Sequence, residues 1–161
     1  GNDNMKCNFL NNRAIHSLNV AKLMSKFSHL INRHPEDMFL LGYIHDIGYA
    51  IGGENSNHHL YGGKFLNHNN YPYYKEILNH GIITDYNSNE LTLLNICDMS
   101  VNSKGEIVTF ENRKKDIAER YGINSKEVQT FDVLRTKIEK TEIYKKIKET
   151  LEKENLYGKQ I

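Results

Sequence analysis

The sequence has few cysteines and no long apolar run, and each of these absences excludes a class of protein. Cys7 and Cys97 are its only cysteines, too few for a disulfide framework. No apolar stretch approaches the roughly 18 residues of a membrane span, and no signal-peptide core opens the chain. We therefore expect a cytoplasmic protein with no membrane partner. Met5 would serve as a natural start, so whether Gly1 is the remnant of a removed tag stays open.

An excess of charge of either sign is also missing. Lysine and arginine number 21 against 20 aspartate and glutamate residues, which leaves a net charge of +1. No field of the whole molecule would draw the chain to nucleic acid. The basic residues Arg113, Lys114, Lys115 and Arg120 lie together without interleaved aromatic residues, which favours a solvated helix face. We do not expect a nucleic-acid partner.

Length and patterning predict a single all-α domain. A chain of 161 residues with 39% hydrophobic and 25% charged residues is typical of one globular domain, and no strand pair would build a sheet. We expect residues 1–161 to form one unit, with a core at about residues 9–122 and a C-terminal helix at about residues 125–155 packed on it. The helices are predicted at residues 10–31, 35–48, 58–68, about 73–80, 87–101, 110–121 and 125–155, with a loop at 51–57 and short extended pieces near 100–101 and 107–109.

The pair His45-Asp46 is the most informative feature of the chain. It follows the apolar run of residues 38–44 and is closed by Ile47-Gly48. Burial of an unpartnered polar group costs roughly 2–7 kcal/mol, and burial of a charge costs more. A metal ion would give both side chains a partner.

Other histidines and an aspartate support this interpretation. His16, His80 and Asp98 lie on apolar stripes of three separate predicted helices, and His58 follows the loop. One such histidine alone is more often a hydrogen-bonded core residue than a ligand. Helix bundles do build metal sites from inward-pointing His and carboxylate side chains, so we expect the set to converge at the centre of the bundle.

The order of these residues resembles the HD-domain superfamily of metal-dependent phosphohydrolases. The similarity covers residues 13–20, 41–48 and 96–98, and residues 58–66 and 77–80 resemble the binuclear branch that includes bacterial diadenosine tetraphosphate hydrolase-like proteins. By this resemblance the fold is an all-α bundle. One metal is implied at His16, His45, Asp46 and Asp98, and a second at His58 and His80 with Asp46 bridging the two. His59 is the alternative to His58.

The resemblance also implies a reaction. Asp46 and His45 would be catalytic through a metal-activated hydroxide that cleaves a phosphate ester or anhydride of a small molecule, for which a nucleotide is our expectation. One or two divalent ions are expected, and iron, manganese, cobalt, nickel and zinc are not distinguished. The basic residues near the motifs, Arg13, Lys64 and Lys104, are candidates for holding phosphate.

Some features depart from the family and leave alternatives open. Tyr49 stands where many relatives have lysine, and Gly81 follows His80 where the diadenosine tetraphosphate hydrolases usually have threonine. The alternatives are a di-iron oxygenase and a regulatory module that holds metal and nucleotide without turnover. Residues 139–154 predict an amphipathic helix that packs on the bundle or, alternatively, forms a homodimer contact.

Overall fold

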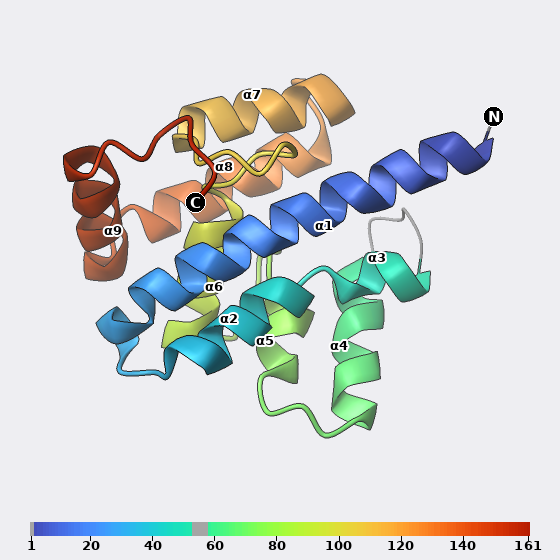
Figure 1. Ribbon diagram of the computed structural model, residues 1–161, viewed down its shortest axis with the longest axis horizontal. Helices are drawn as coiled ribbons and strands as arrows, with labels where there is room; N and C mark the ends of the chain where they lie inside the picture. The colour runs from blue at the N-terminus through green and yellow to red at the C-terminus, as the bar shows by residue number, and fades with distance from the viewer. Residues whose placement is uncertain (1, 53–57) are drawn as a thin grey trace.

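The computed structural model describes residues 2–52 and 58–161, and these form a bundle of helices (Figure 1). The long helix α1 (Asn2–Phe27) crosses the molecule and continues into a 3-10 turn (Ser28–Ile31). It is followed by α2 (Pro35–Ile44), α3 (Ile47–Gly52), α4 (His58–His68), α5 (Tyr74–Asn79), α6 (Asn89–Asp98), α7 (Phe110–Tyr121), α8 (Lys126–Ile138) and α9 (Glu142–Lys153). The predicted all-α fold is confirmed.

Several helices begin where the sequence supplies a capping residue or a favourable first turn. Pro35 is the first residue of α2, with Glu36 and Asp37 in the first turn facing the positive end of the helix dipole. The side-chain oxygens of Thr109, Ser125 and Thr141 each accept a hydrogen bond from the third residue after them and so cap α7, α8 and α9.

The core of the bundle brings α6 together with helices from both ends of the chain. Figure 1 shows α6 passing behind α1 between the α2–α5 half and the α7–α9 half of the molecule. Buried apolar residues of the core come from α1, α2, α5, α6, α8 and α9, for example Leu23, Leu41, Ile77, Leu94, Phe131 and Ile147. Within residues 2–52 and 58–161, no helix combines the length and apolar character that a bilayer crossing requires.

Several predicted boundaries are wrong. The single helix expected at residues 125–155 is two helices, because the chain turns at residues 139–141 and Thr141 caps α9. The helix expected at 10–31 begins earlier, at Asn2, and its last turn is a 3-10 turn. The helix expected at 87–101 is shorter, since α6 starts at Asn89 and Ser88 caps it by accepting a hydrogen bond from the Leu91 amide.

The chain between α2 and α4 also differs from expectation. The predicted helix 35–48 is interrupted, because α2 ends at Ile44 and α3 starts at Ile47. Residues 51 and 52 belong to α3 rather than to the predicted loop, whose remaining residues, 53–57, lie outside the described part.

Two short extended segments pair beyond α6. The helix ends at Asp98, so Val101 lies outside it and forms an isolated antiparallel bridge with Ile107. The chain near its C-terminal end adds to this pairing, since the Ile107 amide donates to the carbonyl of Lys159 at 2.8 Å. The extended pieces predicted near residues 100–101 and 107–109 are therefore present as one bridge.

Candidate metal centre

Two histidines and two aspartates form a first group at the centre of the bundle. The Nε2 atom of His16 on α1 lies 2.7 Å from Oδ1 of Asp98 at the end of α6. The Nε2 atom of His45 lies 3.2 Å from the same oxygen and 3.2 Å from Oδ2 of Asp46. His16 and His45 are fully buried, and the possible ligand atoms of the four residues lie within 4.8 Å of one another.

A second group adjoins the first. The Nε2 atoms of His58, the first residue of α4, and of His80, directly after α5, lie 3.2 Å apart. They lie 3.2 and 3.3 Å from Oδ1 of Asp46. His59 is buried beside them but belongs to neither group of possible metal ligands.

Asp46 belongs to both groups, and each of its two carboxylate oxygens faces a different group. Oδ2 faces His45 and Oδ1 faces His58 and His80. The residue lies between the end of α2 at Ile44 and the start of α3 at Ile47, next to His45. At this helix end the side chains of His45 and Asp46 reach the same site, with His45 Nε2 3.2 Å from Asp46 Oδ2.

Backbone carbonyls orient three of the four imidazole rings. The Nδ1 atoms of His45 and His80 lie 2.6 and 2.5 Å from the carbonyl oxygens of Gly42 and Ile77, and Nδ1 of His16 lies 3.2 Å from that of Asn102. When Nδ1 donates a proton to a carbonyl, Nε2 is left with a lone pair that can bind a metal. The carbonyl contacts at Nδ1 therefore orient the rings of His16, His45 and His80 as in metal-binding histidines.

Close helix contacts bring the donors together. A Cβ on Gly42 would lie 2.7 Å from the Cα of Ala21, so α2 approaches α1 where glycine leaves room. Near His80, Oδ1 of Asn95 in α6 accepts a hydrogen bond from the Gly81 amide at 2.9 Å. This bond ties the segment that carries His80 to the helix that carries Asp98. His80 follows α5 in an extended conformation, rather than lying within a helix as predicted.

Both carboxyl groups of the centre are held in their ionised form. Burial opposes ionisation of Asp46 and Asp98, but His45 and neighbouring hydrogen bonds hold the pKa values of both carboxyls well below their usual range. Burial also opposes protonation of His45, yet the two carboxylates raise its pKa to about 10. Burial lowers the pKa of His16 to about 4, which keeps that ring neutral. A cation would be stabilised between these carboxylates.

Nitrogen and carboxylate donors of this kind fit a divalent transition metal. His and Asp suit iron, manganese, cobalt, nickel and zinc alike, so the donor set does not select one ion. The buried, mutually close donor atoms form two adjacent places where such an ion could be held.

Arg13 is the predicted phosphate-binding residue that the structure places against the centre. Its Nη1 atom lies 3.4 Å from Oδ2 of Asp46, and its guanidinium lies over the ring of Tyr49, 5.3 Å from the centroid. The Nε and Nη2 atoms are buried, and no atom of residues 2–52 and 58–161 forms a hydrogen bond with them. Lys64 and Lys104 are exposed, and no ion pair joins either to the described site residues.

Arg113 contradicts the sequence interpretation. It was expected on a solvated face, but only 12% of its side chain is exposed and its Nη1 pairs with Asp116 at 2.7 Å. Its Nε is buried without a hydrogen-bond partner among the described residues. Its charge also helps to lower the pKa of His16, although burial is the larger cause. The run of basic residues in the sequence does not show that Arg113 is buried, because packing of the helix decides which of these side chains turns inward.

A model of the HD domain family matches residues 13–155 of the chain. The protein belongs to the HD domain family. No curated protein and no solved structure matches it. HD domains are generally metal-dependent phosphohydrolases, and this one has His and Asp groups that could hold metal ions.

The family match covers the segments that carry all six predicted ligands. Three other histidines, His29, His34 and His68, are exposed on the surface of the HD domain. Cys97 is buried next to Asp98 and belongs to the apolar core.

Proposed function

We propose that this HD domain is a binuclear metal-dependent phosphohydrolase acting on a phosphate ester or anhydride of a small molecule, with a nucleotide as the expected substrate. The observation that carries the proposal is the shared carboxylate of Asp46, which offers one oxygen to each group of histidines. A binding module without turnover would not need two adjacent donor groups beside a guanidinium with unused donors.

Each residue has a separate task in this proposal. His16, His45, Asp46 and Asp98 would hold one ion, and His58 and His80 would hold the other with Asp46 in common. Bound there, a pair of divalent ions would lower the pKa of a water molecule and neutralise charge that develops on phosphoryl oxygens. The carboxylates, already ionised in the folded protein, would need no proton loss to act as ligands.

Arg13 would orient the substrate. Its Nη1 is directed at Asp46, which leaves Nε and Nη2 to donate to a phosphoryl oxygen next to the centre. A guanidinium presents such donors in a fixed plane, which gives direction as well as charge. Burial opposes the charge on Arg13, but Asp46 and other nearby acidic groups raise its pKa further, so the cation is permanent.

Metal content per chain tests the proposal first. We expect two ions in the parent protein, measured by elemental analysis after purification without chelators, and one ion in His80→Ala. His68→Ala is the matched control, because His68 is an exposed histidine at the end of α4. A parent that releases phosphate from p-nitrophenyl phosphate or nucleoside polyphosphates only when loaded would support the activity. No ion in the parent, even after reconstitution, would contradict the proposal.

Arg13→Lys is expected to lower kcat/KM for the best phosphate substrate about 10- to 100-fold, with metal content unchanged. Hydrogen bonds to charged groups contribute about 1.5–3 kcal/mol, and lysine cannot reproduce the planar pair of donors. Steady-state kinetics with elemental analysis of the same samples would measure this. Arg33→Lys is the control, since Arg33 pairs with Glu90, away from the centre. Equal kinetics in Arg13→Lys and the parent would remove Arg13 from the substrate site.

A further inference from the structure

His58 differs from the other three histidines of the centre in how its ring is held. His16, His45 and His80 each place Nδ1 within hydrogen-bond distance of a backbone carbonyl. The Nδ1 atom of His58 is buried, and it has no hydrogen-bond partner within the part of the chain that the structure describes. Ligand histidines usually depend on such an outer bond for their orientation, so another contact must fix this ring.

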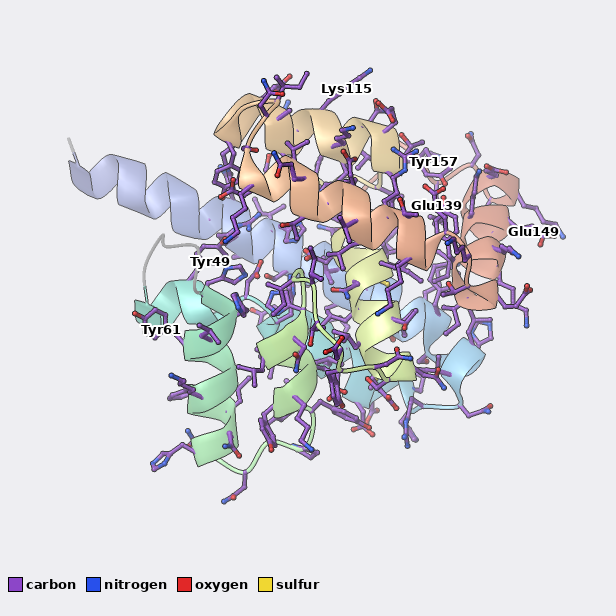
Figure 2. All side chains as sticks on the ribbon, turned by 180° about the vertical axis from the view of Figure 1, so that it is seen from behind. Tyr49, Tyr61, Lys115, Glu139, Glu149 and Tyr157 are labelled. Atoms are coloured by element: carbon purple, nitrogen blue, oxygen red, sulfur yellow. The ribbon has the colours of Figure 1, made fainter. Side chains whose placement is uncertain are left out.

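An aromatic stack supplies that contact. The rings of Tyr49 and His58 lie nearly parallel, with centroids 4.2 Å apart and an interplanar angle of 11°. Tyr49 belongs to α3, and its amide donates to the carbonyl of Asp46 at 3.0 Å, so the stacking ring is anchored to the backbone of the shared ligand. Figure 2 labels Tyr49 where α3 approaches α1, the helix that carries Arg13.

Tyr49 is itself enclosed by the centre. The Arg13 guanidinium lies 5.3 Å from its ring centroid, and burial raises the pKa of its hydroxyl. A tyrosine that served only to fill space would need no particular ring orientation. Here its plane matches that of His58 to within 11°.

We propose that Tyr49 is a positioning residue that holds His58 in the orientation needed to bind the second metal ion. The inference rests on the binuclear centre proposed above. The stack fixes the plane of the imidazole, and Nε2 then lies 3.2 Å from both Asp46 Oδ1 and His80 Nε2. A stack restrains the plane but allows rotation within it, whereas the outer hydrogen bonds of the other rings fix direction as well. The site of His58 and His80 is therefore the weaker of the two.

Titration with Co²⁺, followed by visible absorption and by elemental analysis, tests this on the full chain stripped of metal. In Tyr49→Leu we expect the second ion to bind about tenfold more weakly, the upper end of what an aromatic pair contributes, while the first ion binds as in the parent. Tyr49→Phe keeps the ring and should restore the parent affinities. Tyr43→Leu is the matched control, because Tyr43 is half exposed on α2.

The outcomes separate this inference from the proposed function. A parent that binds two Co²⁺ ions, with unchanged affinities in Tyr49→Leu or equal weakening of both sites, would contradict the role of Tyr49 and leave the binuclear centre standing. A parent that binds no ion would contradict both. Tyr49→Met keeps the apolar volume without a ring and takes the place of Tyr49→Leu if that variant does not fold. Parent affinities in a folded Tyr49→Met would equally overturn the inference.

Discussion

Asp46→Asn is expected to lower phosphohydrolase activity about 10³-fold or more and to reduce metal binding at both sites. The amide keeps the shape of the carboxylate but loses the charge that Oδ2 offers to the His45 group and Oδ1 offers to the His58 group. A loss of about 4 kcal/mol of transition-state stabilisation corresponds to this factor and is within the several kcal/mol that bound metal supplies. Elemental analysis and steady-state kinetics would measure the two effects.

Because Asp46 is shared by both groups, its substitution should change metal binding differently from the substitution of any other ligand. Substitution of His80 should remove one ion, whereas Asp46→Asn should weaken both, because only Asp46 belongs to both described groups. Asp85→Asn is the control, since Asp85 is an exposed aspartate between α5 and α6. Retention of one ion at parent affinity in Asp46→Asn would show that the carboxylate does not bridge two sites.

Gly48→Ala is expected to lower the free energy of unfolding by at least about 2 kcal/mol and to impair the second metal site. A Cβ on Gly48 would lie 1.7 Å from the backbone oxygen of His58, which no side-chain rotation can relieve. Overpacking in a tight site typically costs about 1–3 kcal/mol, and here the displaced group is the ligand backbone itself. Urea unfolding would measure stability, and Co²⁺ titration would measure the second site.

Gly62→Ala provides a graded comparison for this prediction. A Cβ at Gly62 would meet its nearest neighbours at 3.1 Å, so a shift of a few tenths of an ångström accommodates it. We expect a smaller loss of stability and both ions retained. Equal stability of Gly48→Ala and the parent would mean that α3 and α4 separate easily, and the contact would then not position His58.

Local patterns predicted the parts of the fold that depend on neighbours along the chain. The helix at His58–His68 and the helix at Phe110–Tyr121 that ends before Gly122 have the predicted bounds, because their start and stop residues act within one turn. The long predicted helix at residues 125–155 was wrong for the opposite reason. The turn at residues 139–141 contains neither glycine nor proline, so no strong stop signal in the sequence marks the point where the chain changes direction.

For the candidate site too, the sequence predicted some features and not others. The residue types and their order indicated which side chains would converge, since buried imidazoles and carboxylates require partners wherever the chain folds. Neither the inward turn of Arg113 nor the stack of Tyr49 on His58 could be predicted. The first depends on how α7 packs against the rest of the bundle, and the second on how α3 lies against α4.

The sequence by itself determined that this protein is an all-α chain with an ordered set of His and Asp residues at apolar positions, because periodicity, caps and burial costs are local or compositional. The tertiary structure decided how that set is divided. It placed the two oxygens of Asp46 toward different histidines, left donors of Arg13 without partners and gave His58 an aromatic neighbour in place of a carbonyl. These are matters of distance and direction between separate helices, and only the packed chain sets them.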